Sequence, residues 1–404
     1  MGCDGAALFK SKERKFVMQK NVAILGATGS VGTQALDVAR ARGYRVSLLS
    51  AGSNAALAEQ LSREFLPDTV VMASEAAASE LKVRLADTSV RVLGSEAAIC
   101  EAVSACEADV VVNSILGKAG LMPTLSILDS GKRLALANKE SLVIAGSIVM
   151  DRARKTGAES IPVDSEHSAI FQSMKAGRAS EVKRIFLTAS GGPFYGKSLA
   201  EIAGVSVADT LAHPTWKMGK KITVDSATLM NKGFEIVEAA HLFGIPSDRI
   251  RVLVHKESIL HSAVEYIDNS VIGEFSVPDM RSCVQYAVDY PVRDAAVTAE
   301  LDLVKIGALT FSEVDTEAFP LISLASEAYM QGGAMCAVMN AADEIAADAF
   351  LREKIGFNDI SDIVSSVCAQ LAYRKNGSSI EYILEADKEA RELALRLVEA
   401  IRRK

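Results

Sequence analysis

Several features are scarce in this chain of 404 residues, and each absence argues against a class of protein. No apolar run approaches the roughly 18 residues that a membrane-spanning helix needs, so we expect no membrane partner. Lys and Arg number 44 against 51 Asp and Glu, and there is no long basic run. Nucleic acid is therefore not an expected partner either. The 49% of hydrophobic residues is instead the composition of a folded globular protein.

Cysteine is sparse as well. The six cysteines are scattered without CxxC spacing, so we expect neither a disulfide framework nor a zinc site. Residues 1–17, MGCDGAALFKSKERKFV, lack the apolar core of a signal peptide and the composition of an organelle transit peptide. We interpret residues 1–17 as a tail or an added leader, and we expect a bacterial cytoplasmic protein.

What the chain does have, from Asn21 to about residue 155, is a regular alternation of strand and helix patterns. The β-branched runs are NVAIL, YRVSLLS, TVVMA, VRVL, DVVVN and RLALA, and an Ala-rich helical stretch follows each of them. This alternation predicts an α/β fold, in which a parallel, Rossmann-like sheet has helices on both faces.

The rest of the chain has two other patterns. IPVDSE, VKRIFLTAS, RVLVH, SAVEYID and SVIGEFS predict strands, with a hairpin turned at Asp268–Asn269. Beyond about residue 320 the pattern becomes helical and predicts a small bundle. The expected helices are Leu321–Met330, Cys336–Arg352, Ile360–Tyr373 and Ala386–Ile401.

The sequence GATGSVG (residues 26–32) follows the first strand directly and opens a helix. Glycines at such a turn let the backbone approach a pyrophosphate, whose charge the helix N-terminus stabilises. A glycine turn can also be purely structural, but its place on the first strand of the series favours a dinucleotide site. The second strand is followed by Gly52, Ser53 and Asn54, without the carboxylate typical of NAD sites, which favours NADP.

Carboxylates suggest a metal site. Asp164 and Glu166 lie two apart on the expected strand IPVDSE, so we expect both on one face, although an isolated pair of this kind is more often a solvated strand end. Asn231 and Glu235 are four apart and share a helix face, with Lys232 beside them. An all-oxygen set of two or three carboxylates suits Mg²⁺ or Mn²⁺.

Two loops offer polar groups for a phosphorylated ligand. Lys139 follows the sixth strand, where open α/β sheets bind ligands, and Ser190-Gly191-Gly192 is either a phosphate-binding turn or a structural one. The only Trp, Trp216, is usually a core residue type, but beside His213 on a Pro-containing segment it indicates a lid. Further donors are available from Ser226, Asn231 and Lys232.

Taken in order, GATGSVG, LANKES, IPVDSEH, TASGGPF, HPTWKMGKK, VDSATLMNKGFE and VPDMR resemble the 1-deoxy-D-xylulose 5-phosphate reductoisomerase family over nearly the whole chain. The resemblance implies an NADPH- and divalent-metal-dependent enzyme, and a homodimer. It would rearrange 1-deoxy-D-xylulose 5-phosphate to a branched aldehyde and reduce that to 2-C-methyl-D-erythritol 4-phosphate, in the non-mevalonate route to isoprenoids. The implied domains are NADP-binding (18–160), catalytic (161–300) and C-terminal helical (321–404), with a linker at 301–320.

The resemblance also implies roles for individual residues. The metal ligands are Asp164, Glu166 and Glu235, which are catalytic together with Lys139. Lys139 and Glu166 are the candidates for proton handling, and His213 and Trp216 form the lid. The cofactor positions are Thr28, Gly29, Ser30, Val31, Gly52, Ser53, Asn54, Asn138, Glu140 and Gly219. The substrate positions are Lys139, Ser165, Glu166, Ser190, His213, Ser226, Asn231, Lys232 and Glu235.

Two positions depart from the family's usual pattern. Relatives commonly have HPQS where this chain has His255-Lys256-Glu257-Ser258, which puts two charges in a neutral stretch. Ser53 stands where some relatives have Lys or Arg. His261 and Met280, nearby positions of the family's site, are retained.

Two other functions share some of these features. A semialdehyde-type NADP dehydrogenase also uses a glycine turn, but it needs a catalytic cysteine and no metal. A nicotinamide-sensing regulator would bind cofactor without chemistry and would have no use for Asp164, Glu166 and Glu235 together. Sensitivity to EDTA separates both from the reductoisomerase.

Overall fold

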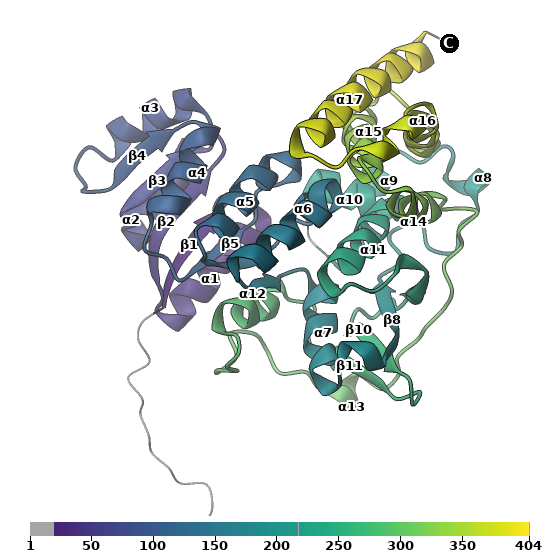
Figure 1. The fold of residues 1–404 in the computed structure, drawn as a ribbon, viewed down its shortest axis with the longest axis horizontal. Coiled ribbons are helices and arrows are strands. Elements are labelled where there is room, and N and C mark those ends of the chain that lie inside the picture. Colours follow the sequence, from purple (N-terminus) through teal and green to yellow (C-terminus); the bar gives the residue numbers. More distant parts are fainter. Residues whose placement is uncertain (1–19, 217, 404) are drawn as a thin grey trace, which may run out of the picture.

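The computed structural model describes residues 20–216 and 218–403. Residues 1–17, expected to be a tail, lie outside the described residues. The described chain forms a parallel-sheet region, a second region with a smaller sheet, and a set of C-terminal helices (Figure 1). The α/β fold expected from the sequence is confirmed. Within these ranges, no helix combines the length and apolar character needed to cross a bilayer.

The first sheet has seven parallel strands in the order β4-β3-β2-β1-β5-β6-β7, and all six strands expected before residue 155 are present. The order reverses between β1 and β5, and ligands of open α/β sheets bind in the crevice at such a reversal. The strands are β1 (Asn21–Leu25), β2 (Arg45–Ala51), β3 (Thr69–Met72), β4 (Arg91–Gly94), β5 (Val110–Asn113), β6 (Arg133–Leu136) and β7 (Ser160–Pro162).

Both faces of this sheet are buried. Val22 and Ile24 of β1 belong to one hydrophobic core, and Ala23 and Leu25 belong to the other. Successive side chains of a strand point to opposite faces, so a strand covered on both sides is apolar throughout. The helices of this region are α1 (Ser30–Arg42), α2 (Ala55–Phe65), α3 (Glu75–Arg84), α4 (Glu96–Ala105), α5 (Leu121–Asp129) and α6 (Glu140–Thr156).

The second sheet has the order β11-β10-β8-β9 and comprises β8 (Val182–Ala189), β9 (Ile250–Val254), β10 (Leu260–Tyr266) and β11 (Val271–Phe275). β10 and β11 form the expected hairpin at Asp268–Asn269, where Asn269 adopts φ +67°. Asn tolerates this left-handed conformation better than most residues. The helices around this sheet are α7 (Ser165–Ser173), α8 (Leu199–Ile202), α9 (Val207–Leu211), α10 (Lys220–Ala227), α11 (Met230–Phe243), α12 (Met280–Asp289) and α13 (Leu303–Ile306).

The four expected C-terminal helices are present as α14 (Leu321–Gln331), α15 (Met335–Leu351), α16 (Phe357–Gln370) and α17 (Ile380–Arg402). The last begins at Ile380, earlier than expected, because Ser379 caps it by accepting a hydrogen bond from the Tyr382 amide. α15 packs against α16 and α17 and also reaches α6 and α10.

The domain borders drawn from the sequence remain a prediction. The parallel sheet continues through β7 to Pro162, and α12 returns from the second region to pack on α1. The interval expected to be a linker contains α13, and its Ser312 bridges to Val254 of β9.

Candidate active site

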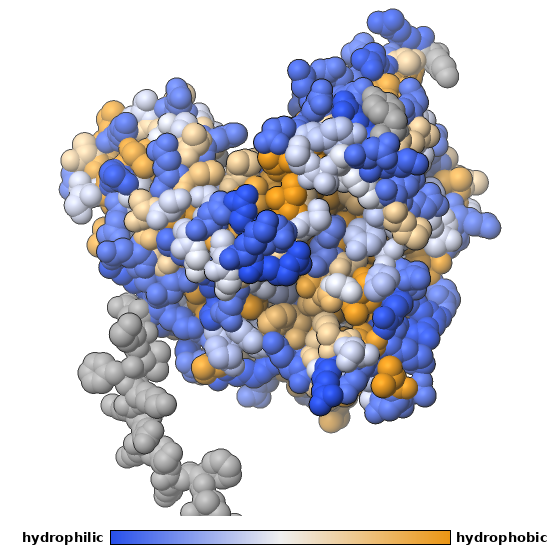
Figure 2. All heavy atoms as spheres, in the orientation of Figure 1, coloured by the Kyte–Doolittle hydropathy of each residue, from blue (hydrophilic) through white to orange (hydrophobic). Residues whose placement is uncertain are grey.

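A cleft of about 1170 Å³ lies where the three regions meet. Its walls include the glycine turn, the loops after β5 and β6, the segment around Trp216, α11, and two side chains from the C-terminal helices. In Figure 2, apolar atoms gather in the hollow between the lobe of the parallel sheet and the C-terminal helices, while most of the surrounding surface is hydrophilic. Most of the residues expected to bind cofactor, metal and substrate border this one space. Five expected cofactor residues are not among those that line it: Thr28, Gly52, Ser53, Asn54 and Asn138.

The glycine turn can form only with glycine at two of its positions. Gly26 adopts φ +77°, and a Cβ there would lie 2.7 Å from the carbonyl oxygen of Ser114. A Cβ on Gly32 would lie 2.1 Å from the carbonyl oxygen of Gly26. α1 then begins at Ser30 with no side-chain cap at its N-terminus, which leaves amide donors facing the crevice between β1 and β5.

Asn138 and Glu140, expected to contact the cofactor, shape the opposite wall of this crevice. The Asn138 amide donates to the carbonyl oxygens of Ile115 (2.7 Å) and Gly117 (3.0 Å). The Glu140 carboxylate accepts from the Gly117 amide at 3.2 Å. Both side chains therefore hold the turn that follows β5. At the end of β2, Asn54 caps α2 by accepting from the Leu57 amide at 3.1 Å.

The carboxylate cluster is built differently from the sequence expectation. The strand expected over IPVDSE is present as β7 but ends at Pro162. Asp164 is instead the N-cap of α7, and Glu166 lies in the first turn of that helix. The expectation that these two carboxylates share a strand face is therefore wrong. Asp-Ser-Glu is a favourable helix start, because acidic side chains there interact well with the helix dipole.

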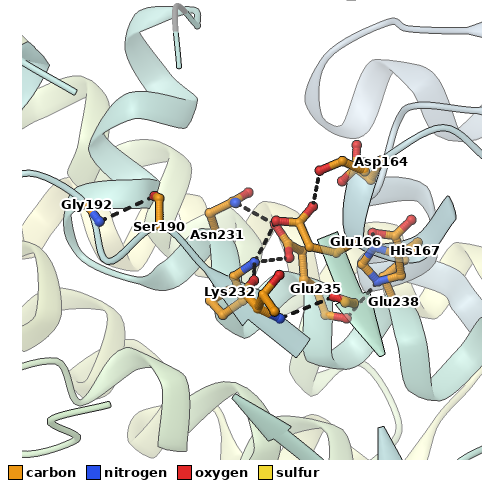
Figure 3. A network of polar contacts seen from close by, with 12 residues as sticks. Asp164, Glu166, His167, Ser190, Gly192, Asn231, Lys232, Glu235 and Glu238 are labelled. Carbon is orange, nitrogen blue, oxygen red and sulfur yellow. Dashed lines mark hydrogen bonds and ion pairs between the residues drawn. The ribbon is translucent and has the colours of Figure 1, made fainter. Parts of the chain in front are cut away.

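Two buried lysines, Lys139 and Lys232, form ion pairs with the carboxylates. Figure 3 shows Lys232 beside Glu166 and Glu235. Lys139 Nζ lies 2.5 Å from Asp164 Oδ2 and 3.3 Å from Glu235 Oε1. Lys232 Nζ lies 2.9 Å from Glu166 Oε1 and 2.5 Å from Glu235 Oε2. It also donates to the carbonyl oxygen of Thr188 at 2.6 Å. Glu235 is thus the carboxylate that both lysines share.

Neutral polar groups complete this network. The expected helix-face pair is present: Asn231 donates to Glu235 Oε1 at 2.6 Å, and its Oδ1 accepts from Lys139 at 2.9 Å. Ser165 Oγ donates to Glu166 Oε2 at 2.9 Å. Asn231 and Lys232 therefore lie among the carboxylates.

The electrostatics of this cluster favour a bound cation. Burial alone would raise the pKa of Glu166, but Lys232 and Lys139 lower it to about 2. Burial and the Glu166 charge raise the pKa of Glu235. Three carboxylates, of which Glu235 is buried and Asp164 and Glu166 are partly buried, face two ammonium groups. The uncompensated negative charge is stabilised by a cation or a proton. The all-oxygen donor set fits a hard divalent ion.

His167 and Glu238, which no sequence pattern had singled out, lie directly behind this cluster. His167 Nε2 is 2.9 Å from the carbonyl oxygen of Glu235, and its Nδ1 is 3.4 Å from Glu238 Oε2. Burial lowers the pKa of His167 to about 4 and raises that of Glu238. Ligand atoms of Asp164, His167 and Glu238 lie within 4.8 Å of one another, which makes them a second possible metal set. The available signal was position: His167 follows Glu166, and Glu238 lies one helical turn beyond Glu235.

Ser190 and His213, expected to bind substrate, contact each other. His213 Nδ1 accepts from the amides of Thr215 (3.2 Å) and Trp216 (2.9 Å), so its proton is on Nε2. That Nε2 donates to Ser190 Oγ at 3.2 Å. Burial lowers the pKa of His213, which favours the neutral ring. Trp216 packs edge-on to His261, with 6.3 Å between ring centroids, and so covers one side of the cleft.

The Ser190 turn also adjoins α10. Gly191 and Gly192 have φ values of +88° and +68°. A Cβ on Gly192 would lie 2.8 Å from the carbonyl oxygen of Ser226, so only glycine allows this close approach. Gly219 is the N-cap of α10 and lines the same cleft.

Both charges of the unusual stretch His255–Ser258 have partners. Glu257 accepts from Thr310 Oγ1 at 2.7 Å, and Lys256 Nζ lies 4.5 Å from the ring centroid of Tyr195. His255 Nε2 accepts from the amides of Ile259 and Leu260, which fixes the backbone that leads into β10. The departure from the family's pattern is accommodated without an unpaired buried charge here.

Comparison with known proteins decides the family. The family model described as 1-deoxy-D-xylulose 5-phosphate reductoisomerase matches residues 22–146, and two models of C-terminal domains of that enzyme match 160–243 and 275–393. The enzyme of this name from Acetivibrio thermocellus is 47% identical over 381 residues, covering 94% of this chain and 100% of the relative. That from Caldanaerobacter subterraneus is 46% identical over 382 residues, covering 93% and 99%.

The chain belongs to the 1-deoxy-D-xylulose 5-phosphate reductoisomerase family.

Solved reductoisomerase structures have the same fold. The enzyme from Zymomonas mobilis in complex with NADPH is 41% identical, with a TM-score of 0.87 over 94% of this chain and 99% of that one. A reductoisomerase in complex with NADPH, fosmidomycin and magnesium is 37% identical, with a TM-score of 0.90 over 94% and 98%. Those two family members thus bind their ligands in a fold that this chain shares.

Proposed function

We propose that this chain is an oxidoreductase that converts 1-deoxy-D-xylulose 5-phosphate to 2-C-methyl-D-erythritol 4-phosphate, using NADPH and Mg²⁺ or Mn²⁺, in the non-mevalonate route to isoprenoid precursors. The observation that carries this proposal is the placement of the glycine turn and the buried carboxylate cluster on one cleft. A reductase must hold its cofactor next to its substrate, so the glycine turn that would bind the cofactor and the carboxylates that would hold the sugar phosphate through a metal ion need to border the same cleft.

In this proposal the cleft has two ends. The pyrophosphate of the cofactor lies on the N-terminus of α1, against Thr28, Gly29, Ser30 and Val31. Bound NADPH supplies the hydride that reduces the aldehyde. Gly52, Ser53 and Asn54 flank the ribose, and Gly219 lies on the cofactor side of α10. Asn138 and Glu140 act by holding the turn that follows β5.

Asp164, Glu166 and Glu235 hold the metal ion, which when bound polarises the substrate carbonyl as a Lewis acid. Burial would raise the pKa of Glu166, but Lys232 and Lys139 lower it and so keep this carboxylate ionised. Lys139 and Glu166 are the residues that move protons, at Nζ and Oε. Ser165 and Asn231 orient these groups through their hydrogen bonds.

The phosphate end of the substrate lies against Ser190, Ser226 and His213, with Lys232 nearby in α11. The uncharged His213 donates to Ser190 and holds the backbone of Thr215 and Trp216. Closure of this segment excludes water from the reacting carbons.

Three buried cysteines are poor candidates for the nucleophile that the dehydrogenase alternative needs. Burial raises the pKa of Cys283, Cys336 and Cys368 to about 12. A thiol at this pKa is not a ready nucleophile at neutral pH. Among the described residues, none of these three cysteines is therefore a plausible acylation site.

NADPH absorbance in the presence of 1-deoxy-D-xylulose 5-phosphate tests the proposal. We expect oxidation that requires Mg²⁺ or Mn²⁺, stops after EDTA and returns when metal is restored. Oxidation that survives EDTA and is abolished by thiol alkylation would identify the dehydrogenase instead. NADPH binding without any oxidation under either metal would identify the regulator.

We further propose a cytoplasmic homodimer. Among the described residues, β11 is an edge strand of its sheet, and it exposes the apolar side chains of Val271, Ile272 and Phe275. Light scattering of the purified protein should give about twice the chain mass of 42.9 kDa. A mass equal to one chain at all accessible concentrations would contradict the dimer.

A further inference from the structure

An ionic cluster around the buried Asp387 links the C-terminal helices to the cofactor side of the cleft. Asp387 of α17 is fully buried, and its Oδ2 accepts from Lys118 Nζ at 2.6 Å. Arg391, one turn further along α17, donates to both oxygens of Asp387 at 3.0 Å. Arg391 also donates to Glu344 of α15 at 2.6 Å. Two cations and two carboxylates thus compensate one another across the boundary between two regions of the fold.

Lys118 belongs to the short helical turn Gly117–Gly120 that follows β5. Glu344 packs closely on the same turn, because a Cβ on Gly117 would lie 2.9 Å from Glu344 Oε1. Asn138 and Glu140 hold the turn from the sheet side. The turn is therefore fixed on one side by the loop after β6 and on the other by α15 and α17.

The position of this turn gives the cluster its significance. β5 is the neighbour of β1 at the reversal of strand order, and the carbonyl oxygen of Ser114 touches the glycine turn at Gly26. Leu116 is 77% exposed although it is apolar, and it lines the cleft together with Gly117, Lys118 and the C-terminal Glu344 and Arg391. A dinucleotide that lies along the start of α1 has this turn as its second wall.

We propose that Asp387 is a positioning residue of the cofactor site: it anchors Lys118 and Arg391, and through them holds the 117–120 turn in the shape that receives NADPH. The C-terminal helices then help to shape the cofactor site, in addition to packing against the rest of the protein. This inference rests on the proposed function, since it takes the crevice to be the NADPH site.

Asp387→Asn is the direct test, because it keeps the side-chain shape and removes the charge. We expect the Kd for NADPH, measured by calorimetry, to rise about tenfold, which equals ~1.4 kcal/mol. The KM for 1-deoxy-D-xylulose 5-phosphate should change less than about twofold, because the carboxylate cluster lies on other elements. In the unliganded protein, amide hydrogen exchange at residues 117–121 should accelerate.

The matched control is Asp348→Asn on α15, which breaks the exposed pair with Arg352 and should leave NADPH affinity unchanged. If Asp387→Asn does not fold, we expect the same rise in the Kd for NADPH from Lys118→Met. The Lys118 side chain is partly exposed, so its replacement should destabilise the fold less. NADPH affinity equal to wild type in the folded variant, with only a lower unfolding temperature, would overturn the inference. A wild-type protein that binds no NADPH would overturn the proposed function itself.

Discussion

Glu235→Gln should lower kcat by roughly a thousandfold, because a metal ion and its activated carbonyl contribute several kcal/mol and each tenfold in rate is ~1.4 kcal/mol. The substitution keeps the side-chain size and the bond from Asn231, but it removes the one charge that both lysines share. The Kd for NADPH should stay within about twofold, because the glycine turn lies on other elements. Steady-state kinetics at saturating Mg²⁺ and calorimetric titration with NADPH measure the two quantities.

Glu238→Gln is the matched control, since Glu238 is equally buried and lies one turn along the same helix. Burial raises its pKa, which disfavours the charged carboxylate, so the neutral amide is a mild replacement at this position. We expect Mg²⁺ affinity close to wild type in Glu238→Gln and strongly reduced affinity in Glu235→Gln. The reverse result would assign the metal to Asp164, His167 and Glu238 and would refute the set proposed above.

The parts of this protein that could be predicted from the sequence are those that depend on residues close together in the chain. NVAIL followed by GATGSVG predicts a strand, a glycine turn and a helix, and β1 and α1 are in those places. The pairing of Asn231 with Glu235 follows from their spacing of one helical turn. The error at Asp164 and Glu166 is also local: Asp-Ser-Glu after a short apolar run fits a strand end and a helix start equally well, and β7 stops at Pro162.

Contacts between segments that are distant in the sequence could not be predicted from such local patterns. Lys139 and Glu235 are 96 positions apart, and Lys118 and Asp387 are 269 apart. A lysine in a sequence is most often a solvated charge, and nothing nearby in the chain marks one that is buried against carboxylates. The resemblance to the reductoisomerase family named Lys139 and Lys232 as site residues, but their placement between the carboxylates emerges only from the packing of α6, α7 and α11.

Gly32→Ala should raise the Kd for NADPH by about a hundredfold, because a Cβ there would lie 2.1 Å from the Gly26 carbonyl oxygen and 2.8 Å from the Ala27 Cα. Both of these atoms belong to the backbone of the turn, so the contact can be relieved only by moving the start of α1 away from the pyrophosphate. Overpacking of this kind also lowers the free energy of unfolding by about 1–3 kcal/mol. Calorimetric titration and chemical denaturation measure the two effects.

Gly204→Ala provides the comparison, because a Cβ at that exposed position would meet nothing within 4 Å. It should leave both NADPH affinity and stability unchanged, since it adds the same methyl group without a backbone contact. In Gly32→Ala the metal site should persist, because the carboxylates lie on α7 and α11, so Mg²⁺ binding measured without cofactor should match wild type. Wild-type NADPH affinity in Gly32→Ala would show that the cofactor does not bind at the start of α1, since a Cβ 2.1 Å from the Gly26 carbonyl oxygen requires the start of this helix to shift.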